Sequence, residues 1–163
     1  MITDAPALKR FIYDDGGRAA AGFNGITSDC ACRAISIATG KPYQEVQDGL
    51  NALCALLGEP LNGLRIVRGL RRQRASAEIG IPPPITHLYL GQLGWCWTST
   101  NAARLHRCDP PTGRLVVKLT QHLVALIDNV VHDHGDYWRG HRTVHGYFTR
   151  NSQEQPHTGD NYV

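Results

Sequence analysis

The stretch Ser28-Asp-Cys-Ala-Cys-Arg-Ala-Ile35 is the most informative part of this sequence, because it combines the start of a helix with two cysteines. Small apolar residues recur at positions 31, 34, 35 and 38, which is the spacing of one helix face. Ser28 or Asp29 can cap the helix, and Gly40 follows its last turn as a stop signal. The stretch therefore predicts a helix that packs its small-residue stripe onto a core.

Cys30 lies in the first turn of this predicted helix. Unpaired N–H groups and the positive end of the helix dipole favour a thiolate over a thiol there. Cys32 is roughly 200° further around the helix, so the two thiols cannot enter one pocket or close an unstrained disulfide. We expect Cys30 to be the functional thiol, although the charge of Asp29 would partly oppose its ionisation. The alternative is that both cysteines are small buried residues.

A hairpin is predicted near the other end of the chain. Three runs rich in Val, Leu and Ile are typical of strands: Arg114–Leu119, Gln121–Ile127 and Val130–Asp133. Asp128 and Asn129 suit a two-residue turn between the last two runs. Such a turn pairs Ile127 with Val130, Val124 with Asp133 and His122 with Gly135.

This register places His122 and Asp133 on one face of the hairpin. They would be diagonal neighbours roughly 7 Å apart at the backbone, which lets the carboxylate reach the far nitrogen of the imidazole. Cys30, His122 and Asp133 are therefore candidates for a thiol nucleophile, its general base and the group that orients the base. Strand alternation points His132 and His134 to the opposite face, and we expect both to lie apart from a site on His122.

A metal site is the alternative interpretation of these histidines. His132, His134 and Asp136 form a His-x-His-x-Asp pattern, and imidazole with carboxylate suits zinc or iron. The cysteines lie far away in sequence, and the chain has no Cys-x-x-Cys or His-Glu-x-x-His motif. We therefore predict neither a metal nor a cofactor.

The order of a helix-starting cysteine, a strand-starting histidine and an aspartate that ends the next strand resembles the papain-like cysteine peptidases. The resemblance is strongest to their compact bacterial branch, which includes the peptidase domains of bacteriocin exporters. Three stretches are also similar to a group of uncharacterised bacterial and phage proteins: Asp29–Val46, Leu93–Thr98 and Gly113–Asp133. That second similarity carries no activity with it.

The papain-like resemblance implies an α+β fold in which an N-terminal nucleophile helix packs on a small antiparallel β-sheet. It makes Cys30 the nucleophile, His122 the general base and Asp133 the orienter. These peptidases usually carry a glutamine six positions before the cysteine, where its amide helps to bind the oxyanion. This chain has Asn24 there, and asparagine can donate the same hydrogen bond from a shorter arm. Asn24 also lies between Gly22 and Gly25, so the alternative of a simple turn residue stays open.

Composition limits the class of protein. A chain of 163 residues with 42% hydrophobic residues is long and apolar enough for one globular domain, which we place at residues 1–150. Residues 151–163 are polar and aperiodic, which predicts a disordered tail. The sequence shows no signal peptide and no run of eighteen apolar residues, so no membrane partner is expected. Five irregularly spaced cysteines favour a reducing compartment, with the cytoplasm as the expected location.

The remaining elements are predicted more coarsely. Residues 1–28 form a loop-rich lead, and Pro42–Leu57 a second helix whose buried face is Val46, Leu50, Leu53 and Leu57, with Cys54 as inert core. The prolines at 82–84 are expected outside any regular element, followed by a short helix at Ile85–Leu93. Trp95 and Trp97 alternate in a strand, as core residues or as a wall facing a substrate.

The basic residues do not indicate a nucleic-acid partner. Five arginines fall within Arg65–Arg74, but the net charge of the chain is only +3. The cluster also lacks the interleaved aromatic residues that bind single strands. It fits an ordinary solvated surface.

The sequence thus predicts a thiol hydrolase or acyl transferase, a cysteine peptidase or isopeptidase acting on a protein or peptide without a cofactor. A bacterial or phage origin is implied by the resemblance alone. The alternative is a catalytically silent papain-like protein, such as a phage or bacterial factor that binds a host protein. The oligomeric state is not predicted.

Overall fold

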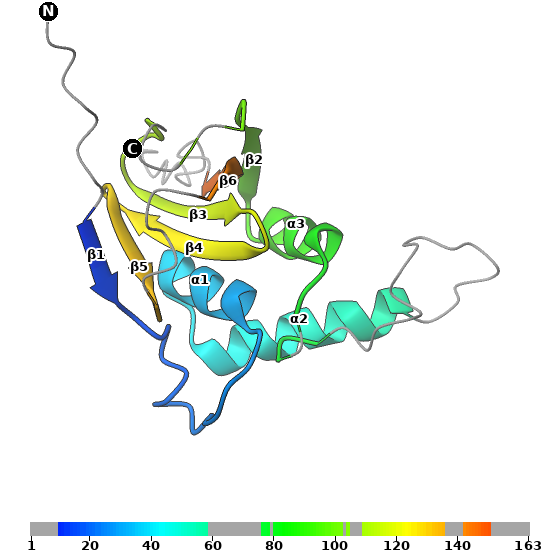
Figure 1. Cartoon of the computed structure of the whole chain (residues 1–163). Coiled ribbons are helices and arrows are strands. Elements are labelled where there is room, and N and C mark those ends of the chain that lie inside the picture. Colours follow the sequence, from blue (N-terminus) through cyan, green and yellow to red (C-terminus); the bar gives the residue numbers. More distant parts are fainter. Residues whose placement is uncertain are drawn as a thin grey trace, which may run out of the picture.

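The computed structural model describes residues 10–58, 76–78, 80–102, 104, 109–135 and 142–150. It confirms an α+β architecture (Figure 1). In chain order the elements are β1 (Arg10–Tyr13), α1 (Cys30–Thr39), α2 (Tyr43–Gly58), α3 (Pro83–Gln92), β2 (Trp95–Ser99), β3 (Arg114–Leu119), β4 (His122–Ile127), β5 (Val130–Asp133) and β6 (Val144–Arg150). The basic stretch at Arg65–Arg74 and the predicted tail at 151–163 lie outside the described residues.

The six strands form one mixed sheet in the order β1-β5-β4-β3-β6-β2. All neighbouring pairs are antiparallel except β1 and β5, which run parallel from Arg10 opposite Val130 to Tyr13 opposite Asp133. The predicted sheet was therefore too small, and its purely antiparallel character was wrong. Residues 1–28 were predicted to be loop-rich, but β1 lies within them. This strand has four residues, is exposed at a sheet edge and pairs over a long sequence separation, so no local pattern marks it.

Helix α1 ends as predicted. Gly40 adopts a left-handed conformation with φ of 73°, and its N–H donates to the carbonyl oxygen of Ser36. The start differs from the prediction, because Asp29 occupies the cap position but makes no capping hydrogen bond. In α2, Val46, Leu50 and Leu53 are buried as predicted, whereas Leu57, predicted on the same face, is only partly buried.

Helix α3 begins two residues earlier than predicted. Pro83 and Pro84 form its first turn, so the expectation that residues 82–84 lie outside regular structure was wrong for two of the three prolines. The first N–H groups of a helix have no acceptor within the helix, and a proline there loses no hydrogen bond. Its fixed φ also favours the helical conformation.

The helices pack as a layer against the sheet (Figure 1). Helix α1 lies across β4 and also contacts β3 and β5, α2 packs on α1, and α3 packs on α2 and β2. The core between these elements includes Ile35, Leu50, Ile85, Leu90, Val116 and Phe148. A second buried cluster uses the alternate residues of the strands, among them Leu115, Val117, Val124, Leu126 and Val131.

Arg114 fastens the end of α1 to the sheet. From β3, its Nε donates to the carbonyl oxygen of Ala38 at 2.8 Å, and a terminal nitrogen donates to that of Ile37 at 2.7 Å. A cation at a helix C-terminus satisfies unpaired carbonyls and complements the helix dipole. With its far end held, α1 presents its first turn at a fixed place beside β4.

The β4–β5 hairpin has the predicted turn, and its three strand pairs follow the predicted register, whereas the predicted pairs Val124–Asp133 and His122–Gly135 are not among them. Asp128 and Asn129 have φ values of 46° and 66°, which is the left-handed pair that a type I′ turn needs. Ile127 pairs with Val130, and the register continues to Ala125 opposite His132. His122 and Asp133 therefore lie on the same face of neighbouring strands.

Substitution of Gly146 tests the packing of β6 against β2. A Cβ at this position would collide with the carbonyl oxygen of Thr98 and the ring of Trp97. We expect Gly146→Ala to lower the free energy of unfolding by about 1–3 kcal/mol, measured by urea denaturation. The control is Gly91→Ala in α3, where no atom lies within 4 Å of the added carbon. This control should raise stability by about 0.5–1 kcal/mol, and equal effects at both positions would contradict the packing described.

Candidate active site

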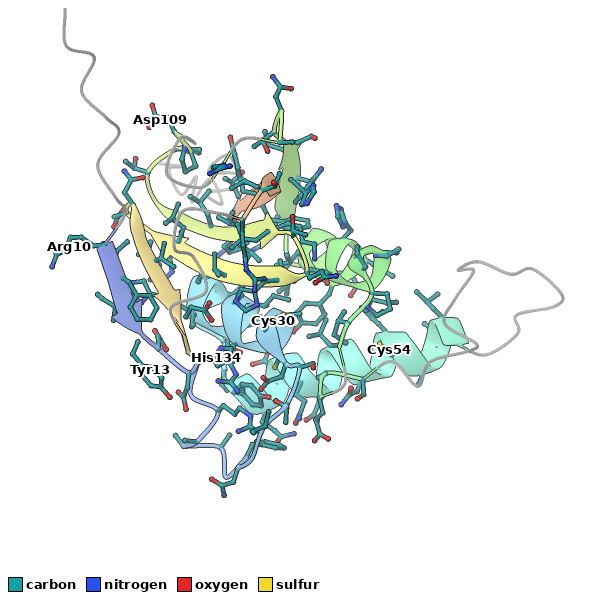
Figure 2. All side chains as sticks on the ribbon, in the orientation of Figure 1. Arg10, Tyr13, Cys30, Cys54, Asp109 and His134 are labelled. Carbon is teal, nitrogen blue, oxygen red and sulfur yellow. The ribbon has the colours of Figure 1, made fainter. Side chains whose placement is uncertain are left out.

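Cys30 is the first residue of α1 and is half-buried where the helix meets the start of β4 (Figure 2). Its thiol is hydrogen-bonded to the imidazole of His122, and the backbone N–H of Leu123 donates to the same sulfur. The sulfur is thus held against β4 by two consecutive residues of one strand.

His122 is linked to Asp133 on the other side of its ring. Its Nε2 lies 2.6 Å from Oδ2 of Asp133, and the two side chains are 9% and 4% exposed. An ionised carboxylate only accepts hydrogen bonds, so Nε2 carries the hydrogen and Nδ1 remains for the thiol. The contact that the hairpin register predicted is confirmed, and it joins the three residues in one chain of hydrogen bonds.

The electrostatics of the three groups favour a Cys30 thiolate paired with a His122 imidazolium. Burial by itself would raise the pKa of the Cys30 thiol, but the hydrogen bond and charge of His122 outweigh it and lower that pKa. Burial would likewise lower the pKa of His122, yet its hydrogen bonds to Asp133 and Cys30 and their charges raise it to about 9. Burial of Asp133 is outweighed by its hydrogen bonds to His122 and His134, which lower the pKa of its carboxyl. The proton is therefore favoured on the imidazole and not on the sulfur.

His134 belongs to this site, and the prediction that it lies apart from His122 was wrong. Its backbone N–H donates to Oδ1 of Asp133 at 2.8 Å, and its ring Nδ1 lies 3.0 Å from the same oxygen. Strand alternation does not extend to His134 because β5 ends at Asp133. Gly135 was the signal in the sequence that the strand stops there. His132 does lie elsewhere, with its Nδ1 3.2 Å from a carboxylate oxygen of Asp14.

Asn24 is exposed in the loop that precedes α1. Its backbone carbonyl accepts a hydrogen bond from Arg18 at 3.0 Å, and its side-chain amide bonds to no described residue. Its role as an oxyanion donor stays a prediction. The N–H groups of the first turn of α1, starting with that of Cys30, are a second source of donors because they have no acceptor within the helix.

Asp29, whose charge was expected to oppose the ionisation of Cys30, is paired with two arginines, and its effect on Cys30 stays a prediction. Its carboxylate is 1% exposed and lies 2.9 Å from Nε of Arg18 and 2.8 Å from Nε of Arg33. The hydroxyl of Tyr43 also donates to it at 2.6 Å. Two guanidinium groups therefore offset part of the charge of Asp29. These partners of Asp29 were not predicted, although the i, i+4 spacing of Asp29 and Arg33 in the sequence was a signal for one of them.

Cys32 and Cys54 have no comparable surroundings. Cys32 is fully buried with its sulfur 3.5 Å from the carbonyl oxygen of Tyr43. Burial, together with the charge of Asp29, raises the pKa of the Cys32 thiol to about 12. Cys54 is buried on α2, as predicted, and burial raises its pKa as well (Figure 2). Of the two thiols on α1, the surroundings of Cys30 alone favour a thiolate.

A cavity of about 330 Å³ lies near the start of β4, and the described residues that line it include neither Cys30 nor His122. It is lined by Ile81, Pro83, Thr86, His87, Trp97, Lys118, Leu123, His145 and Phe148. Leu123 joins the cavity to the site, because its backbone N–H bonds the Cys30 sulfur. Lys118 also lines it, and the charge of Lys118 helps to lower the pKa of Cys30.

The described residues contain no group of three or more His, Cys, Asp or Glu side chains placed to hold a metal ion. No helix among them is long and apolar enough to cross a membrane.

The lowered pKa of Cys30 can be tested by alkylation. We expect iodoacetamide to modify Cys30 faster than Cys96 at about pH 6, because a thiolate paired with an imidazolium stays nucleophilic below the ordinary thiol pKa of about 8.5. Cys96 is exposed on β2 and controls for access of the reagent. Peptide mapping by mass spectrometry gives both rates in one sample. His122→Ala should remove the advantage of Cys30, and equal rates in the unmodified protein would contradict the ion pair.

Comparison with known proteins adds no relative. A scan against protein-family models, a search of curated proteins and a search of solved structures each found no match for this chain. The chain is therefore described by its own architecture. It is an α+β chain in which the start of a helix meets a hydrogen-bonded histidine and aspartate of a six-stranded mixed sheet.

Proposed function

We propose that this protein is a papain-like thiol hydrolase or acyl transferase, a cysteine peptidase or isopeptidase that acts on a protein or peptide. The observation that carries the proposal is the continuous chain of hydrogen bonds from the Cys30 thiol through His122 to Asp133. A buried carboxylate, an imidazole with a raised pKa and a thiol with a lowered pKa are what a thiol nucleophile requires.

The first half of the reaction forms an acyl-enzyme. The Cys30 thiolate attacks the substrate carbonyl carbon, a C–S bond forms, and the carbonyl π electrons move onto oxygen. N–H groups at the start of α1 are candidate donors for this oxyanion, with Asn24 as a second candidate. The His122 imidazolium gives its proton to the leaving nitrogen as the C–N bond breaks, and a thioester remains on Cys30.

The second half releases the acyl group. Neutral His122 removes a proton from an attacking water or amine, whose oxygen or nitrogen bonds the thioester carbon. The C–S bond then breaks and the pair of electrons returns to sulfur, which restores the thiolate and imidazolium. Water as acceptor makes the protein a hydrolase, and an amine makes it an acyl transferase. Neither route requires a metal or cofactor.

The alternative of a silent binding protein is less well supported. Such a protein would keep the scaffold while its thiol turned away from the base. Here the sulfur is hydrogen-bonded to His122, and this contact is what lowers the pKa of Cys30. A chemically poised thiol favours the enzyme. A reducing compartment such as the cytoplasm would keep it free, as are the described cysteines.

The orienting role of Asp133 is tested by Asp133→Asn. The His134 backbone N–H would hold the amide oxygen of the new side chain, so its NH₂ group would face Nε2 of His122. An NH₂ donor forces the wrong tautomer on the imidazole, and we expect kcat/KM to fall by about 10²-fold or more. Thermal unfolding should change little, because the new side chain has the same shape.

The matched control is Asp128→Asn in the hairpin turn. Asp128 accepts a hydrogen bond from Gly113 N–H at 3.0 Å through an oxygen that asparagine also has, and asparagine tolerates its positive φ. Its activity should match that of the unmodified protein. Loss of activity at Asp128 with none at Asp133 would overturn the assignment of the triad.

The pH dependence of hydrolysis follows from the two shifted groups. The imidazolium of His122 persists up to its pKa of about 9 and is lost above it. Activity should therefore rise with pH as Cys30 ionises and fall as the pH passes about 9. The measurement is kcat/KM against pH for a peptide amide identified from a library, because its leaving nitrogen needs the proton. A rate that keeps rising beyond the pKa of His122 would show that its proton is not used.

A further inference from the structure

His134 comes directly after the last residue of β5 and contacts the carboxylate of Asp133 twice. Its backbone N–H donates to Oδ1 of Asp133 at 2.8 Å, and its ring Nδ1 lies 3.0 Å from the same oxygen. The chain bends at His134 and Gly135, which lets the ring turn back toward the preceding side chain. The rings of His134 and His122 lie 6.2 Å apart between centroids, and both imidazoles meet at this one carboxylate.

The two oxygens of the carboxylate have different partners. Oδ2 lies 2.6 Å from Nε2 of His122, whereas Oδ1 receives both contacts from His134. Burial would raise the pKa of the Asp133 carboxyl, but hydrogen bonds from both histidines outweigh it and keep the group ionised. An ionised carboxylate only accepts hydrogen bonds, so Nδ1 of His134 carries a hydrogen and donates it to Oδ1.

These contacts decide where the carboxylate points. The backbone of Asp133 is held by the N–H of Asp14, just after β1, which donates to its carbonyl oxygen at 2.9 Å. The side chain can still rotate on this fixed backbone, but a carboxylate whose Oδ1 accepts from two donors cannot turn without breaking both bonds. The Asp133 side chain is 4% exposed, so loss of a donor would leave a buried acceptor short of a hydrogen bond, which is costly.

We propose that His134 is a positioning residue, whose ring holds the Asp133 carboxylate in the orientation that directs Oδ2 at Nε2 of His122. This inference rests on the proposed function and adds a residue that supports its base. The effect reaches the nucleophile through the hydrogen-bonded chain. Asp133 stabilises the imidazolium of His122, and the imidazolium in turn stabilises the Cys30 thiolate.

Alkylation of the full-length protein with iodoacetamide at about pH 6 tests this role without a substrate. His134→Leu removes the ring donor and fills its space with an apolar group of similar size. We expect the rate at Cys30, relative to that at the exposed Cys96, to fall roughly threefold to tenfold, which is the effect of one net hydrogen bond. His134→Asn should restore most of the rate, because its side-chain amide carries an N–H at the position of ring Nδ1.

The matched control is His132→Leu, because the ring of His132 contacts Asp14. This substitution should leave the rate at Cys30 unchanged. In an Asp133→Ala background, His134→Leu should cause no further fall, since the carboxylate through which it acts is gone. Thermal unfolding establishes that each variant is folded under the conditions of the assay. A fall that persists in the Asp133→Ala background, a full rate in His134→Leu, or equal slowing by His134→Asn would overturn the proposal.

The tautomer of His134 separates this proposal from the thiol chemistry. Nitrogen NMR of its neutral imidazole ring should show the hydrogen on Nδ1, because that atom donates to Asp133. A ring whose Nδ1 lacks the hydrogen would overturn the positioning role whatever the reactivity of Cys30. Equal alkylation of Cys30 and Cys96 in the unmodified protein would instead overturn the proposed function.

Discussion

The geometry of the site depends on the ion pairs and the hydrogen bond that the buried carboxylate of Asp29 forms. A lone charge at 1% exposure would be unstable, and here Arg18 and Arg33 balance it while Tyr43 donates a further hydrogen bond. Arg18 also donates to the backbone carbonyls of Phe23 and Asn24. One anchor thus holds the loop before the nucleophile, the start of α1 and the start of α2.

Using Asp29 in this way leaves the start of α1 without a side-chain cap. A capping carboxylate would have covered N–H groups of the first turn. Uncapped, these groups keep their partial positive charge close to the Cys30 sulfur. The helix gives up the stability that a side-chain cap would add. Cys32, only two residues further on, has a raised pKa because it is buried and feels the charge of Asp29.

Local patterns in the sequence predicted the parts of the fold that local chemistry controls. Gly40 marks the end of α1, and Asp128-Asn129 fixes a hairpin whose register brings His122 to Asp133. The prediction that alternating side-chain directions place His134 apart from His122 was wrong, because this alternation applies only to residues within the strand. Strand β1 was missed since its pairing partner, β5, lies more than a hundred residues away. Strand β6 was missed as well, although it joins β2 to β3 in the sheet.

The residues that surround the site could not be predicted from the sequence, because they come together only in the folded chain. The chain has 17 lysine and arginine side chains, and charge alone does not say which of them meets Asp29. The cavity is assembled from α3, β2, β3, β4 and β6, so its walls exist only once the sheet order is fixed. Trp97 illustrates the point, because the sequence allowed it to be a core residue or a wall. Its ring packs on the core through Phe148, which confirms the first alternative, and it also lines the cavity. A role in facing a substrate stays a prediction, because packing against the core and lining a cavity do not exclude one another.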